Sequence, residues 1–127
     1  MGGYPAKTKS MAFLSGGLIL ATSGAPGLVV WPFAGPTGPM GKQAVELAYD
    51  QASLVARVAA VTELGIVAGG REDGRVFALA LRGSKVESVR ADKGAPISAL
   101  ALSPDGRRVA WGDEDGAAAV SDLPPLA

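Results

Sequence analysis

The stretch ISALALSPDGRRVAWGDEDG, residues 97–116, gives the clearest indication of the fold of this 127-residue chain. Apolar side chains alternate along 97–102 and again along 107–111, which is the two-residue period of a β-strand. Ser-Pro-Asp-Gly between these strands has Pro and Gly where a tight turn needs them, and Asp-Glu-Asp-Gly at 113–116 is a second turn. The stretch therefore predicts two consecutive hairpins, with the third strand at 117–122.

Two further copies of this pattern lie upstream. The first aligned segment, Glu72-Asp73-Gly74, lies 42 residues before Glu114-Asp115-Gly116, and the same offset without gaps aligns Val67, Ala68 and Gly70 with Val109, Ala110 and Gly112. Nearest the N-terminus, Met11, Phe13, Gly17, Leu20, Ala21 and Gly27 align with Leu100, Leu102, Gly106, Val109, Ala110 and Gly116. The repeats are 42 and 47 residues long, which is typical of propeller blades.

Alternation and turn residues predict four short strands in each complete repeat. The expected strands are 10–14, 18–22, 28–33 and 45–49 in the first repeat, 54–61, 65–69, 75–81 and 85–89 in the second, and 97–102, 107–111 and 117–122 in the third. The predicted fold is all-β, with β-propeller blades of four antiparallel strands, about 2.75 blades per chain, and a ring that is incomplete within one chain. We expect one partial propeller domain over 1–127, with blades at about 8–50, 54–92 and 96–122 and a tail at 123–127.

The third repeat resembles the WD40-repeat family, in its first strand, turn, second strand and Asp-Gly turn, and the resemblance extends over nearly the whole chain. It implies a scaffold that binds proteins or peptides. Asp73 and Asp115 match the family's turn aspartate, which implies a structural role for both. The Trp-Asp pair that closes the third strand is replaced by Trp31-Pro32, Leu79-Ala80 and Ser121-Asp122, and the Gly-His pair is absent, so other propeller families with similar blades stay open.

The chain contains no cysteine and no histidine, which excludes disulfides, thiolate nucleophiles, Cys/His zinc sites and Ser-His-Asp triads. Twelve basic and twelve acidic residues leave no net charge to attract nucleic acid or an anionic membrane. We therefore expect a cytoplasmic, non-catalytic protein with no cofactor, no metal, no nucleic-acid partner and no membrane partner. The apolar run 11–21, followed by small residues, resembles a signal peptide, and the longer uncharged stretch 11–34 is long enough to span a membrane, which gives a secreted or periplasmic alternative. Glycines and prolines interrupt the stretch, where a continuous helix would be costly.

Three motifs have a catalytic or ligand-binding alternative. Asp113-Glu114-Asp115-Gly116 lacks the spaced ligands of a calcium loop and is interpreted as a tight turn. The carboxylates Asp50, Asp92 and Asp105 fall in predicted turns, with no spacing that pairs an acid with a base. Gly41-Lys42 is followed by Gln43, where a phosphate-binding loop needs Ser or Thr, so residues 27–42 are interpreted as a strand followed by a long connection.

We expect the partner to contact the turns between second and third strands and the connections that lead into the next blade. The candidate binding residues are Asp50, Gln51, Arg71, Glu72, Asp92, Lys93, Asp113 and Glu114. Exposed apolar blade faces at both ends of the stack predict a homo-oligomer, a dimer or larger, that completes the ring. Two alternatives remain: a propeller enzyme or sugar binder that uses the central channel, and a truncated propeller without independent function.

Overall fold

The computed structural model of the protein describes residues 10–14, 19–32, 45–47, 53–61, 65–80 and 86–124. All the regular structure in these ranges is β-strand, arranged as three antiparallel sheets. In the uncharged run at 11–34, the described residues form strands at 11–14, 19–22 and 28–32, with a bend at 24–27 between the last two. None of the described segments is a helix long and apolar enough to cross a membrane.

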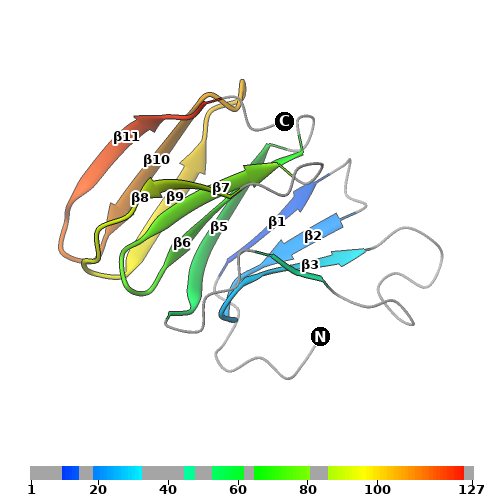
Figure 1. The fold of residues 1–127 in the computed structure, drawn as a ribbon, viewed down its shortest axis with the longest axis horizontal. Coiled ribbons are helices and arrows are strands. Elements are labelled where there is room, and N and C mark those ends of the chain that lie inside the picture. Colours follow the sequence, from blue (N-terminus) through cyan, green and yellow to red (C-terminus); the bar gives the residue numbers. More distant parts are fainter. Residues whose placement is uncertain are drawn as a thin grey trace.

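Each sheet is one blade, and its strands lie side by side in chain order (Figure 1). The first blade contains β1 (Met11–Leu14), β2 (Ile19–Thr22), β3 (Leu28–Pro32) and β4 (Val45–Leu47). The second contains β5 (Val55–Val61), β6 (Ile66–Arg71), β7 (Val76–Ala80) and β8 (Val86–Arg90). The third contains β9 (Ile97–Leu102), β10 (Arg108–Asp113) and β11 (Ala118–Asp122).

These sheets confirm the predicted fold class. The strands agree closely with the predicted ranges, because alternating apolar residues bounded by Gly, Pro and Asp fix both the strand type and its ends. The three blades pack face to face in a row, with the second between the other two (Figure 1). Across the described ranges they form an open stack that does not close into a ring.

The 42-residue offset is reproduced in the backbone of the second and third blades. In the turn 71–75 the Gly74 amide donates to the Arg71 carbonyl over 3.1 Å, and in the turn 113–117 the Gly116 amide donates to the Asp113 carbonyl over the same distance. Both glycines have a φ of 88°. This left-handed conformation is costly for residues with a Cβ, so the two Asp-Gly turns have the same glycine requirement.

The first blade departs from the gap-free alignment at the corresponding turn. Ala21 pairs with Val30, nine residues on, whereas Ala68 pairs with Ala78, ten residues on. The turn is thus one residue shorter, and its left-handed glycine is Gly24, with a φ of 103°, and not Gly27. The match of Gly27 with Gly116 is therefore a coincidence of sequence.

Neighbouring blades pack apolar faces against each other. In the interface between the first two blades, Ala21, Leu28 and Val30 pack against a group from the second blade: Val55, Val58, Val67, Phe77 and Leu79. In the next interface the pattern recurs, because Ala68, Val76 and Ala78 of the second blade pack with residues from the third blade and the segment after it: Ile97, Val109, Leu123, and the partly buried Leu100, Leu102 and Trp111. Leu123, where the tail was predicted to begin, is therefore part of this interblade core.

Candidate protein-interaction rim

Three chain segments meet at one end of the second and third blades: the turn 71–75, the loop 91–96 and the turn 113–117 (Figure 1). Backbone hydrogen bonds join them. The Gly94 amide donates to the Asp73 carbonyl over 2.7 Å, and the Glu114 amide donates to the Pro96 carbonyl over 3.0 Å. We call these three segments the rim. Its shape is fixed by the main chain, independently of the side chains it displays.

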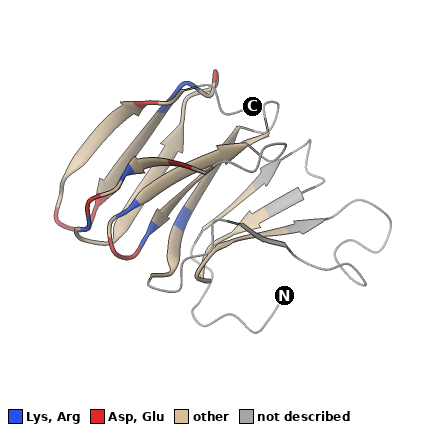
Figure 2. Ribbon diagram, in the orientation of Figure 1, with Lys and Arg blue, Asp and Glu red and all other residues tan. Residues whose placement is uncertain are grey.

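Exposed charged side chains gather along the rim. Figure 2 shows Asp, Glu, Lys and Arg positions along these turns, with a second group at the opposite end of the third blade. The exposed charged residues of the rim are Glu72, Asp92, Lys93, Glu114 and Asp115. Four carboxylates against one ammonium make the rim locally acidic, although the whole chain has no net charge. Four of the eight predicted binding residues therefore lie together at the surface.

Arg71 was predicted to lie on the binding surface, but it is buried, with only 4% of the residue exposed. Its Nη1 donates to the carbonyls of Pro26 and Ser53, both over 2.7 Å, and its guanidinium lies 5.2 Å from the centre of the Phe77 ring. A buried guanidinium is stable only when its donors are satisfied, and these contacts supply that. Arg71 thus joins the second blade to the first blade's turn.

Asp113 is also buried, with 8% exposed. It makes the hydrogen bonds within the turn that were expected from Asp115. Its Oδ1 accepts hydrogen bonds from the amides of Asp115 and Ala117, each over 3.0 Å. Its Oδ2 lies 3.4 Å from Nη1 of Arg90 on the second blade. Asp115 itself is exposed, so in the third blade the structural aspartate stands two residues before the expected one.

Arg71 and Asp113 occupy equivalent positions, 42 residues apart, at the ends of β6 and β10. Each uses its charge to bind the preceding blade, Arg71 as a donor to Pro26 and Asp113 as an acceptor from Arg90. The position is therefore an interblade link in which the sign of the charge has been reversed. This explains why two residues that were predicted as surface ligands are buried.

Asp73 binds within its own turn. Its Oδ1 accepts a hydrogen bond from the Arg75 amide over 3.2 Å, and its Oδ2 lies 2.8 Å from both Nε and Nη2 of Arg75. Burial raises the pKa of Asp73, but the hydrogen bonds and charge of Arg75, together with the charge of Lys93, outweigh burial and hold this pKa below its usual value. The carboxylate is thus ionised at neutral pH and tied to its own turn.

Two predicted binding residues are not described by the structure, and one contact of the rim was not predicted from the sequence. Asp50 and Gln51, the remaining predicted ligands, fall outside the described residues. Arg90 was not predicted, although its Nη1 approaches the Gly74 carbonyl and Asp113 Oδ2, each at 3.4 Å. No local pattern marks Arg90, because its partners come from another turn and another blade.

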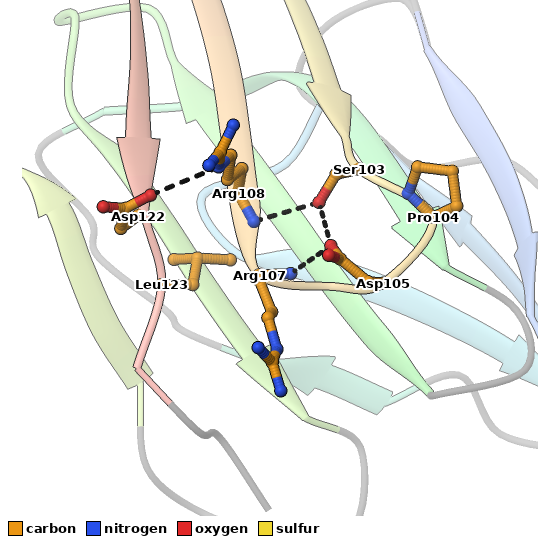
Figure 3. Close-up of a pocket in the computed structure, with 7 residues that line it drawn as sticks. All are labelled: Ser103, Pro104, Asp105, Arg107, Arg108, Asp122 and Leu123. Carbon is orange, nitrogen blue, oxygen red and sulfur yellow. Dashed lines mark hydrogen bonds and ion pairs between the residues drawn. The ribbon is translucent and has the colours of Figure 1, made fainter.

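A shallow hollow of about 700 Å³ lies at the opposite end of the third blade (Figure 3). Ser103 Oγ donates to Asp105 Oδ1 over 2.6 Å, and Nε of Arg108 lies 3.4 Å from Asp122. The side chain of Arg107 points away from both pairs (Figure 3). Because two carboxylates offset the two arginines, the hollow has no excess charge with which to select a ligand.

Asp105 has a structural role in this hollow. The hydrogen bond from Ser103 and that from the Arg107 amide hold the pKa of Asp105 below its usual value. Ser103 Oγ also accepts from the Arg108 amide over 3.0 Å, so these residues complete the β9–β10 turn. Within the described part of the chain, no group of three or more Asp or Glu residues is placed to hold a metal ion.

Comparison with known proteins supports the fold and no finer assignment. No protein-family model matches the sequence, and none of the curated proteins is similar to it. The fold is similar to a chain in the "Crystal structure of Nidogen/Laminin Complex", with a TM-score of 0.67 over 93% of this chain and 12% sequence identity. The match spans 45% of the length of that chain. At this identity the likeness concerns the propeller fold alone.

Proposed function

We propose that this chain is a non-catalytic protein-interaction module of the WD-repeat type, and that its rim binds a basic segment of a partner protein. The observation that carries the proposal is the gathering of four exposed carboxylates on three segments that main-chain hydrogen bonds hold together. A site held in shape before binding loses little conformational entropy when a partner docks. The two Glu-Asp-Gly turns, 42 residues apart, support the WD-repeat type.

The charge on the rim selects the chemistry of the partner. Glu72, Glu114 and Asp115 come from two successive Asp-Gly turns, and Asp92 comes from the loop between them, so the negative potential extends across two blades. Lys and Arg side chains on a partner would complement this potential, raise the association rate and make binding weaken with salt. Lys93 offers a position at which one acidic residue of the partner would be accepted.

The proposal is tested by selecting peptides of twelve residues from a random displayed library against the wild-type chain. The expected peptides are rich in Lys and Arg and bind the Glu114→Lys variant at least about ten-fold more weakly, because a rim charge is reversed. Asp122→Lys is the matched control, since it makes the same charge change at a residue that is 90% exposed at the opposite end of β11. Selected peptides without basic residues, or equal loss of binding in both variants, would contradict the proposal.

A further inference from the structure

The outer face of the third blade repeats a surface that is buried elsewhere in the chain. Val120 is 66% exposed on this face, and it shares it with a set of small residues: Ala99, Ala101, Ala110, Gly112 and Ala118. The 42-residue offset aligns Ala110, Ala118 and Val120 with Ala68, Val76 and Ala78. Those three residues are buried, and they pack against the third blade. The third blade therefore displays the small-residue half of an interblade interface.

Gly112 supports this equivalence. A Cβ on its counterpart Gly70 would lie 2.4 Å from Cγ2 of Ile97, so glycine is required there because the next blade comes so close. A Cβ on Gly112 would meet only ordinary contacts, of which the nearest is the Ala117 carbonyl oxygen at 3.7 Å. Neither glycine has a positive φ. The contacts among the described residues would therefore allow a side chain at Gly112. A glycine at this position is what a blade packed on this face would need.

The first blade has an exposed apolar residue, Met11, at a position that would meet such a face. Met11 on β1 is 58% exposed, and it aligns with Val58 and Leu100, which both pack in interblade cores. Next to it in the alignment, apolar Phe13 and Leu20 stand at the sequence positions of Leu102 and Val109. Met11 and Val120 are the two most exposed large hydrophobic residues in the described part of the chain. They lie on opposite ends of the stack.

We propose that two copies of the chain dock head to tail, with the third-blade face of one copy covered by the first-blade face of the other. The contact would repeat an arrangement that already occurs twice within the chain, between the first and second blades and between the second and third. Two such contacts close a ring of about six blades, within the range that propellers use. The Asp113–Ala117 turn would then lie beside the second copy's first blade, which extends the rim across the contact.

Sedimentation of the full chain at micromolar concentration tests the docking. The wild type is expected at twice the mass of the chain. Val120→Lys and Met11→Lys are each expected to raise the dimer dissociation constant at least about ten-fold, because each puts a charge into one apolar half of the contact. Val86→Lys is the matched control, since Val86 is a 43% exposed residue of β8 on neither face, and it should leave the mass unchanged.

A mixture of the two variants identifies the geometry. Met11→Lys keeps an intact third-blade face and Val120→Lys keeps an intact first-blade face. A mixed dimer therefore has one fully intact contact, which neither variant has alone, so the mixture should dimerise more readily than either variant by itself. Circular dichroism of each variant shows whether it is folded. A monomeric wild type, a Val120→Lys variant that still dimerises, or a folded mixture that stays monomeric would each overturn the proposal.

Discussion

The guanidinium of Arg90 lies over the indole of Trp111, 4.5 Å from its ring centre, so the last strand of the second blade is anchored on the core of the third. The same guanidinium reaches Asp113 Oδ2 and the Gly74 carbonyl. One side chain therefore links two turns of the rim and two blades. The stability of the blade interface and the shape of the proposed binding surface should depend on it together.

Replacing Arg90 should weaken the stack of blades. Arg90→Met is expected to lower the free energy of unfolding by about 1–2 kcal/mol, because it removes the stacking on Trp111 and an ion pair with the buried Asp113. Arg90→Lys keeps the charge and loses the planar group, so its free energy of unfolding should lie between those of the wild type and Arg90→Met. Urea unfolding followed by tryptophan fluorescence measures both, and a lysine variant as stable as the wild type would show that stacking contributes nothing.

Arg71 should contribute more to the stability of the protein than an exposed arginine does. Arg71→Met leaves the buried carbonyls of Pro26 and Ser53 without a charged donor, which should cost about 2–3 kcal/mol. Arg107→Met, at an exposed position, should change stability by less than about 0.5 kcal/mol. Thermal and urea unfolding of the two variants compare these effects directly. Equal stabilities would refute the interblade link.

The two equivalent glycines should differ in their tolerance of a methyl group. Gly70→Ala places a Cβ against Ile97 and should lower the unfolding free energy by about 1–3 kcal/mol, whereas Gly112→Ala should change it by less than about 0.5 kcal/mol. Both are best measured in the Val120→Lys background, where association does not contribute. A large loss in Gly112→Ala would mean that this face is already covered within one chain.

Asp73 should stabilise the protein in a pH-dependent way. Its folded pKa lies below the usual 3.8, so its contribution is complete above that value and is lost as the pH falls through the folded pKa. Asp73→Asn keeps an oxygen near the Arg75 amide but removes the charge, and should cost about 1 kcal/mol at neutral pH. The difference should shrink as the pH falls through the folded pKa of Asp73, and a difference that persists in acid would point to turn geometry instead of charge.

Local sequence patterns predicted the strands, most of the turns and the number of blades. Alternation along 97–102 and the Asp-Gly turns at 73–74 and 115–116 are local signals, because a strand's period and a left-handed glycine depend on neighbouring residues only. The alignment named the wrong turn glycine in the first blade. It matched Gly27 with Gly116, but the turn is one residue shorter and the residue with a positive φ is Gly24. Strand positions on either side of that turn were still predicted correctly.

Which charged side chains face solvent could not be predicted, because it depends on contacts between distant parts of the folded chain. Arg71 and Asp113 stand beside Glu72 and Glu114 in the sequence and look like the same kind of surface residue, yet the first two are buried and the second two exposed. Burial at these positions depends on Pro26, Ser53 and Arg90, which come from other parts of the chain. A charged side chain can be buried here only because a distant segment supplies its partner, and the neighbouring residues in the sequence do not identify that segment.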